Sequence, residues 1–220
     1  MKKLIALYIL AATAFTVNAQ NDPQAKAILD QVSAKNKAFK TISTAFTITG
    51  TSTQNADKTT QKGTLLIKGD KYMIKLPDSE VYFDGKDVYN YLPASNEVNI
   101  SKQQPSGSKG DDIFISNPRD VFKIYQKDFK NKFVKETTEG GKQVYEIDLY
   151  PVDLKKKYSR IRLHIEKSSY QILSMRAFFK DGFQYAITFD KFEANKEISD
   201  NTFVFDKSKY PNVEVIDLRF

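Results

Sequence analysis

The sequence predicts a mainly β protein with a strongly curved antiparallel sheet that closes partly into a barrel. Two observations support this fold class. Short runs in which apolar and polar residues alternate recur along the chain, about ten in all, and several are separated by Gly-Asp, Pro-Asp-Ser or Asp-Gly. Only two stretches repeat their apolar residues at helical spacing. Many strands with few helices indicate a curved sheet rather than a helical bundle.

The stretch 63–91, GTLLIKGDKYMIKLPDSEVYFDGKDVYNY, gives the clearest strand signal. It contains four alternating runs: Leu65 and Ile67; Tyr72, Ile74 and Leu76; Val81 and Phe83; Tyr89 and Tyr91. Alternate residues of a strand point to opposite faces, so each run has one apolar face. We therefore expect an antiparallel meander that covers something apolar.

The N-terminal residues are typical of a secretory signal peptide. Met1-Lys2-Lys3 is followed by an apolar run over 4–17 and by the small residues of Val17-Asn18-Ala19. The run is shorter than the about 20 residues that span a bilayer. We expect cleavage after Ala19, a single domain at 20–220, and a monomer that is soluble in the periplasm. The chain has no Cys, which excludes a lipidated leader, disulfides and thiolate metal sites.

Charge argues against a nucleic-acid partner. The whole chain has 34 basic and 27 acidic residues, and most Lys side chains lie near Asp or Glu in sequence. The one dense basic block is Lys155-Lys156-Lys157. Nucleic-acid binding usually needs a concentrated basic stripe. We interpret the charge as a solvated surface, with a weak attraction for anionic headgroups or an acidic partner as the alternative.

The first helix is predicted to begin at Asp22-Pro23, where Asp caps and Pro fits the first turn. Its apolar stripe consists of Ala25, Ile28, Leu29, Val32, Phe39 and Ile42. This stripe fits a helix that packs on the core and equally one that plugs an apolar cavity. A long strand follows over 43–54, with Phe46 and Ile48 on one face.

A polar segment, SKQQPSGSKGDD at 101–112, is predicted to be a mobile loop. Asn117-Pro118 then begins a second predicted helix, whose apolar side carries Val121, Phe122, Tyr125 and Phe129. A hinged lid and an ordinary packed helix would both show this pattern.

The rest of the chain is predicted to be strands. They lie at 144–150, 159–167, 170–180 and 183–192, with a hairpin at Asp181-Gly182, and a final pair of short strands is expected at 203–205 and 213–216. In the second of these, Ile161, Leu163 and Ile165 alternate with polar residues.

No motif predicts catalysis. His164 is the single His, on the polar face of its strand, and is expected to be a solvated surface side chain rather than a metal ligand. The chain has no G-x-S-x-G elbow and no glycine-rich phosphate loop. An S-x-x-K match at Ser106–Lys109 lies in the polar loop and is attributed to chance. We expect no enzymatic activity, no cofactor and no bound metal.

With the strands placed, the order of motifs resembles the periplasmic LolA-type carriers of outer-membrane lipoproteins. The likeness begins with Phe39-Lys40-Thr41-Ile42 leading to Phe46, continues with G-x-L-x-I-K at 63–68, and includes the run VYFDGKDVYNY at 81–91. Asn96-Glu97-Val98 and the segments 181–189, 195–205 and 213–216 complete it. One departure concerns lid latching: Gly69-Asp70 follows Lys68, where many carriers have Arg-Pro.

This resemblance implies a half-open β-barrel closed by helices, with an apolar cavity for acyl chains. It implies a chaperone that carries lipoproteins from the inner to the outer membrane, with acylated lipoproteins, an inner-membrane lipoprotein-releasing complex and an outer-membrane acceptor as partners. The implied cavity and lid residues are Phe46, Ile48, Leu65, Ile67, Tyr72, Ile74, Val81, Phe83, Tyr91, Val121, Phe122, Tyr125, Ile161, Leu163 and Ile165.

Two alternatives remain open at this point. The same fold could carry or sense another lipid or amphiphile in the periplasm, and a hydrolase of envelope lipid is disfavoured by the missing nucleophile motifs. The alternation also fits a sheet whose inner residues fill a core without a cavity.

Overall fold

One curved antiparallel sheet organises the part of the chain that the computed structural model describes, residues 22–53, 58–103 and 128–219. Within these residues the helix α1 is Pro23–Ala38 and the sheet has 12 strands. The strands are β1 Thr41–Ser52, β2 Lys58–Lys68, β3 Lys71–Lys75, β4 Glu80–Phe83, β5 Asp87–Leu92, β6 Glu97–Lys102, β7 Phe129–Glu139, β8 Lys142–Pro151, β9 Tyr158–Glu166, β10 Ile172–Phe179, β11 Phe183–Ala194 and β12 Glu214–Asp217.

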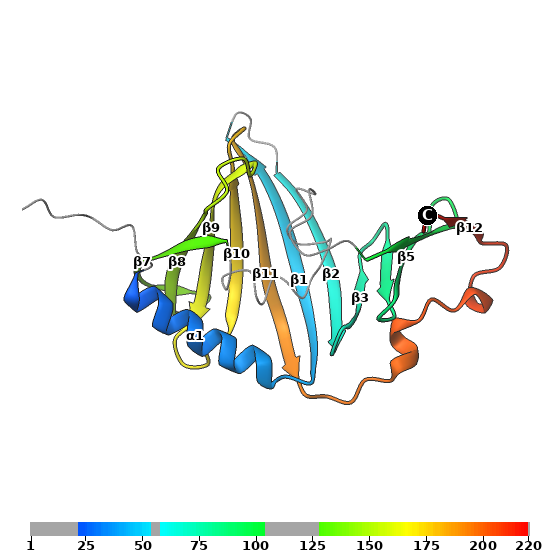
Figure 1. Cartoon of the computed structure of the whole chain (residues 1–220), viewed down its shortest axis with the longest axis horizontal. Helices are drawn as coiled ribbons and strands as arrows, with labels where there is room; N and C mark the ends of the chain where they lie inside the picture. Colours follow the sequence, from blue (N-terminus) through cyan, green and yellow to red (C-terminus); the bar gives the residue numbers. More distant parts are fainter. Residues whose placement is uncertain (1–21, 54–57, 104–127, 220) are drawn as a thin grey trace, which may run out of the picture.

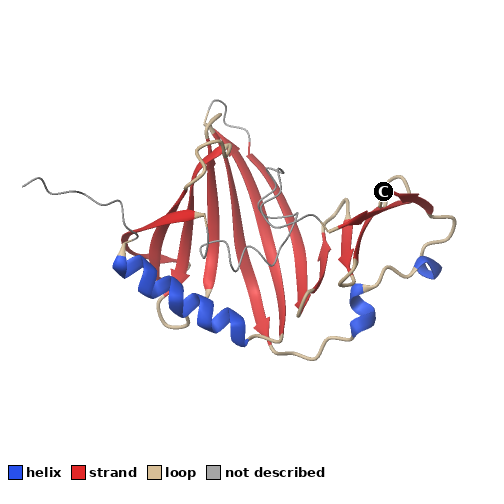
Figure 2. Ribbon diagram, viewed as in Figure 1, coloured by secondary structure: helices blue, strands red, loops and turns tan. Residues whose placement is uncertain are grey.

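The strand order shows two meanders joined by one pair. The order is β12-β6-β5-β4-β3-β2-β1-β11-β10-β9-β8-β7, and every pair is antiparallel except β12 with β6. The first meander, β1 to β6, meets the second, β7 to β11, only through β1 and β11. The sheet curves strongly but its edge strands β7 and β12 do not pair, so it is not closed into a barrel (Figure 1, Figure 2). The curved antiparallel sheet is thus confirmed, whereas a barrel closed by helices is not.

The helix α1 crosses one side of the sheet, which we call the inner face (Figure 1). Its start is confirmed: Asp22 Oδ1 accepts hydrogen bonds from the backbone N–H groups of Gln24 and Ala25 at 2.9 and 3.2 Å. The buried side of α1 joins the main core through Ala25, Ile28, Leu29 and Val32. The helix ends at Ala38, so Ile42 belongs to β1 and not to the helical stripe.

Asp22 also fixes α1 to the edge of the sheet. Its second carboxylate oxygen, Oδ2, accepts a hydrogen bond from the Phe133 N–H at 3.1 Å, and its own N–H donates to the Asn131 carbonyl at 3.2 Å. One side chain therefore satisfies backbone donors at a helix start and on the edge strand β7, which would otherwise be left without partners.

The C-terminal segment differs from its prediction. Residues 203–205 are not a strand: Phe203 ends a 3₁₀ helix at Asp200–Phe203, a second 3₁₀ helix is Lys207–Lys209, and only β12 is extended and paired. This segment packs on the opposite side of β4 to β6, the outer face. There Phe205 stacks on Tyr210 with ring centroids 4.8 Å apart, and Tyr210 packs on Tyr91 at 4.3 Å.

Two further differences concern the middle of the chain. The strand β7 was not predicted, because its lysines and glutamate at 130, 132, 135 and 136 leave few apolar residues to alternate. Residues 117–127 of the predicted second helix and most of the predicted loop over 101–112 lie outside the described residues. Phe129, which was predicted to lie on that helix, instead begins the strand β7.

Candidate functional site

The inner face brings together ten of the residues predicted to line an apolar cavity. Because directly opposed residues in a sheet share a face, the pairing of Phe46 with Phe189 and of Leu65 with Ile74 places these strands in register. All ten are buried in one core cluster with the apolar side of α1: Phe46, Leu65, Ile67, Tyr72, Ile74, Val81, Phe83, Ile161, Leu163 and Ile165. Ile48 is half-buried and packs against this cluster.

Tyr91 does not lie with them. In the β4–β5 pair it opposes Glu80, whereas Val81 opposes Asn90, so Tyr91 faces the outer side. It packs there with Val98 and Val213 in a second, smaller cluster. The prediction failed because β4 and β5 are covered on both faces, which removes the polar side that would mark the outer one.

Val121, Phe122 and Tyr125, the predicted lid residues, lie outside the described residues. The turn at Gly69-Asp70 lies within the described residues, and Gly69 has φ +56°, in the left-handed region. Lys68 Nζ lies 2.7 Å from Asp200 Oδ1 and donates to the Ile198 carbonyl at 2.7 Å. Here the Lys of the motif therefore holds the C-terminal segment against the β2–β3 turn.

A row of four aromatic side chains crosses one end of the inner face. Phe129 stacks on Tyr158, with ring centroids 6.2 Å apart, and Tyr158 meets Phe179 edge-on at 6.2 Å. Phe179 in turn meets Tyr185 edge-on at 5.5 Å. This aromatic row comes from four strands, β7, β9, β10 and β11.

The aromatic row changes from buried to exposed along its length. Tyr158 is buried, and this burial raises the pKa of its phenol to about 12, so it stays neutral. Tyr185 is 39% exposed, and Phe183, two residues earlier on the same face of β11, is 44% exposed. In Figure 1 the helix α1 crosses the opposite ends of β9, β10 and β11. Large apolar side chains thus stay accessible at the end of the inner face where β11 begins.

Sequence reasoning did not select this aromatic row as a site. The alternation of Phe183, Tyr185, Ile187 and Phe189 is regular and was sufficient to place all four on one face. What it could not show is that the first two stay exposed while the last two are buried. That difference depends on which end of the strand α1 covers.

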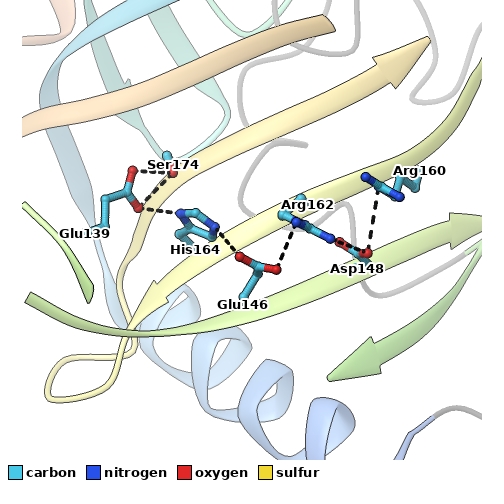
Figure 3. Close-up of polar contacts among 7 residues, drawn as sticks. All are labelled: Glu139, Glu146, Asp148, Arg160, Arg162, His164 and Ser174. Atoms are coloured by element: carbon cyan, nitrogen blue, oxygen red, sulfur yellow. Dashed lines mark hydrogen bonds and ion pairs between the residues drawn. The ribbon is translucent and has the colours of Figure 1, made fainter. Parts of the chain in front are cut away.

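A network of polar side chains, which we call the outer network, lies on the outer face of the second meander (Figure 3). Its members are Glu139, Glu146, Asp148, Arg160, Arg162, His164 and Ser174. Arg162 Nε donates to Asp148 Oδ1 at 2.7 Å and its Nη1 lies 2.9 Å from Glu146 Oε1. The Arg160 guanidinium lies 4.0 Å from the centre of the Phe178 ring. The carboxylates of Glu146 and Asp148 are buried, so the arginines compensate charges that water reaches poorly.

His164 lies between two carboxylates of this outer network. Its Nδ1 is 2.6 Å from Glu139 Oε2 and its Nε2 is 3.2 Å from Glu146 Oε2. The hydrogen bond to Glu139 raises the pKa of the imidazole, against the opposing effect of desolvation. The prediction of an outward-facing His is confirmed, but the prediction of a solvated side chain is wrong.

The outer network lacks the geometry of a catalytic triad. Ser174 Oγ donates to Glu139 at 3.0 Å, so its proton points to a carboxylate and not to an imidazole base. Among the described residues no three His, Asp or Glu side chains are arranged to hold a metal ion. In the same part of the chain no helix is long and apolar enough to cross a membrane.

Comparison with solved structures identifies proteins of similar fold. A conserved uncharacterized protein from Thermus thermophilus superposes with a TM-score of 0.58 at 12% identity, over 88% of this chain and 99% of that chain. Weaker similarity is found to the lipoprotein LppX of Mycobacterium tuberculosis (TM-score 0.48, 11% identity, 81% of this chain and 100% of that one). A LolA superfamily protein from Nitrosomonas europaea is also similar (TM-score 0.42, 12% identity, 83% and 98%). At 12% identity, the similarity to the Thermus thermophilus protein concerns the fold alone.

Comparison with curated proteins gives no match in sequence. A family model described as an uncharacterized protein matches residues 80–198, a region that runs from β4 past the end of β11 and takes in the aromatic row. This match spans more than half of the 220 residues. The chain therefore belongs to this family of uncharacterized proteins.

Proposed function

We propose that the protein is a periplasmic carrier that binds the acyl chains of lipoproteins on the inner face and takes them from the inner to the outer membrane. The observation that carries the proposal is the aromatic row, which passes from the buried Tyr158 to the exposed ring of Tyr185. The exposed Phe183 lies two residues from Tyr185 on the same face of β11. Burial of an acyl chain gains about 0.8 kcal/mol per CH₂, so an accessible apolar face binds lipid without covalent chemistry.

The binding residues that we propose are the apolar side chains of the inner face, with Ile48, Phe179 and Tyr185 as the first contacts. The ten predicted residues that are buried on the inner face would then line the deeper part of the site. The partners that we propose are acylated lipoproteins, an inner-membrane releasing complex and an outer-membrane acceptor. We also propose that residues 1–19 are a cleaved leader, which gives a mature chain that begins at Gln20 and is detected by its intact mass.

A pair of neighbouring substitutions tests the binding face. Ile48 and Thr49 are consecutive and half-buried, and they point to opposite faces of β1. An aspartate at the inner position would be desolvated by a bound acyl chain, at a cost of several kcal/mol. We expect Ile48→Asp to weaken binding of a triacylated lipopeptide and of a pyrene-labelled fatty acid at least tenfold, and Thr49→Asp to leave both unchanged.

Equal binding by the two folded variants would refute the proposed face. Mass spectrometry of molecules that co-purify from the periplasmic fraction tests the cargo itself. Intact acylated protein supports lipoprotein transport, whereas free phospholipid or glycolipid alone would favour the alternative of a carrier for another amphiphile.

A further inference from the structure

Two neighbouring hairpin turns lie together at one end of the sheet. They are residues 152–157, between β8 and β9, and residues 180–182, between β10 and β11, and we call them the apex. The Lys180 N–H donates to the Lys157 carbonyl at 2.9 Å, and Lys180 Nζ donates to the Leu154 carbonyl at 2.6 Å. Figure 1 shows these turns at the upper end of the strands, away from the helix α1.

The apex exposes large apolar side chains from an ordered backbone. Leu154 is 80% exposed, the highest value for a large apolar side chain among the described residues, and Val152 is 60% exposed. The turn that carries them is hydrogen-bonded: Val152 N–H donates to the Asp128 carbonyl at 2.8 Å, and Lys155 N–H donates to Asp153 Oδ1 at 2.9 Å. The backbone therefore holds the Leu154 side chain in water, where its apolar surface contributes no favourable free energy of burial.

Basic side chains surround these apolar ones. Lys155, Lys156 and Lys157 follow Leu154 directly, and Lys180 comes from the neighbouring turn. Among the described residues, no ion pair involves Lys155 or Lys156. The nearest carboxylate in sequence, that of Asp153, accepts a hydrogen bond from the backbone of the turn. The apex thus combines protruding apolar groups with the ammonium groups of Lys155 and Lys156, which form no ion pair within the described part of the chain.

We propose that the apex docks the protein onto an anionic lipid bilayer, with Val152 and Leu154 inserted among the acyl chains and the lysines against the headgroups. A bilayer fits this surface better than an acidic protein does. The apolar groups stand on the tip of a convex hairpin, whereas a protein partner would need a flat or hollow surface to bury them. Anionic headgroups attract each nearby lysine, and this attraction weakens as salt is added.

Docking of the apex would place the proposed binding face at the membrane. Tyr158 directly follows Lys157, and Phe179 directly precedes Lys180, so the aromatic row begins where the apex ends. An acyl chain that leaves the bilayer at this point would meet aromatic rings and not water. The proposal nevertheless goes beyond lipid carriage, because docking requires no bound acyl chain.

The absence of Trp from the chain provides a direct test. A single Trp introduced by Leu154→Trp reports its own surroundings, and Leu218→Trp is a matched control because Leu218 is a leucine 49% exposed beyond the end of β12. Both variants are mixed with vesicles of phosphatidylcholine containing phosphatidylglycerol and with vesicles of phosphatidylcholine alone. We expect a blue shift of emission for Leu154→Trp on the anionic vesicles only, and no shift for Leu218→Trp. No shift at position 154, or equal shifts at both positions, would overturn the proposal.

A second measurement separates charge from insertion. Lys155→Gln with Lys156→Gln is compared with Lys35→Gln and Lys37→Gln, two exposed lysines in the last turn of α1. In vesicle flotation we expect the apex pair to lose about 30-fold in binding at low salt and the helix pair to lose little. Leu154→Ser should lose about tenfold or more. Equal loss for the two lysine pairs would mean attraction by the net charge alone and would refute docking by the apex.

The carrier function and membrane docking by the apex can be refuted independently of each other. Vesicle binding is measured without lipopeptide, and lipopeptide binding is measured without vesicles. A protein that binds lipopeptide through Ile48 but ignores anionic vesicles refutes the docking surface alone. A protein that docks through Leu154 but does not distinguish Ile48→Asp from Thr49→Asp refutes the carrier function alone.

Discussion

The ring of Phe46 in β1 occupies the space beside Gly63, its direct partner in β2. A Cβ atom at position 63 would lie 2.5 Å from Phe46 Cζ and 2.6 Å from the Lys75 carbonyl oxygen. Glycine in a strand normally weakens it, and an aromatic side chain laid across the glycine restores the lost contact. The glycine of the G-x-L-x-I-K motif is thus required by the packing of the inner face.

Gly63→Ala should destabilise the protein by about 1–3 kcal/mol, because both the Phe46 ring and a backbone carbonyl would have to move. Gly50→Ala is the matched control on the same sheet. A Cβ at position 50 would meet the Thr59 hydroxyl at 2.7 Å and the Tyr185 ring at 3.2 Å, both of which belong to exposed side chains and not to the backbone. Urea denaturation of the two variants measures the difference, and a Gly63→Ala variant as stable as Gly50→Ala would contradict this packing.

Asp22→Ala should cost about 1–2 kcal/mol, since the helix cap and the bond to the edge strand are lost together. Asp30→Ala removes an exposed carboxylate from the same helix, 2.6 Å from Lys26, and should cost less than about 0.5 kcal/mol. Hydrogen exchange provides the specific readout: in Asp22→Ala the amide of Phe133 should exchange faster, and in Asp30→Ala it should not.

Stability should depend on pH through His164. Its folded pKa is raised above the usual value of about 6.5, first by the hydrogen bond to Glu139, so the folded state binds the proton more tightly than the unfolded state. The stabilising contribution is therefore complete below about pH 6.5 and is lost as the pH rises through the raised pKa. Because the chain has one His, the imidazole proton resonance in NMR gives this pKa without assignment by mutation.

His164→Gln is the control for that titration. It should remove the loss of stability that His164 causes as the pH rises above about 6.5, and it should also raise the pKa of Glu139, which His164 holds below its ordinary value. A pKa for His164 at or below about 6.5 would contradict the two carboxylate contacts.

Phe205→Ala should destabilise the C-terminal segment by about 2 kcal/mol, because the half-buried ring contacts four aromatic side chains. The partners are Tyr82, Tyr89, Tyr91 and Tyr210, with ring centroids 4.8 to 6.2 Å away. The neighbouring Val204 is 45% exposed, so Val204→Ala should cost little. Limited proteolysis should then cut Phe205→Ala after β11 faster than the parent protein, and equal cutting rates would show that the segment is held by other contacts.

Alternation predicted the strands that have one covered face. Leu65 with Ile67, and Ile161 with Leu163 and Ile165, were assigned correctly because polar neighbours mark the opposite face. The Asp22 cap and the Asp181-Gly182 hairpin depend on local chemistry, with Gly182 at φ +90°, and were also readable from sequence.

The errors occurred where long-range packing determines the structure. Tyr91 was assigned to the wrong face because the C-terminal segment, about 120 residues later, covers β5 from outside. Phe203 and Phe205 suggested a strand, but their rings instead pack from a 3₁₀ helix and a loop onto strands already in place. The surroundings of His164 depend on Glu139 and Glu146 from two other strands, which no local pattern indicates.

The single pair between β1 and β11 has a consequence for how the molecule assembles. Each meander is made of strands that follow one another in sequence, so each can pair as soon as it is made. The junction between the meanders can form only after β11 has been synthesised, because it joins residues far apart in sequence. For example, Thr41 Oγ1 donates to the carbonyl of Lys196, 155 residues later. Contacts of such high contact order form slowly. For a chain exported as we propose, this delay keeps the two halves of the sheet apart until β11 has been synthesised.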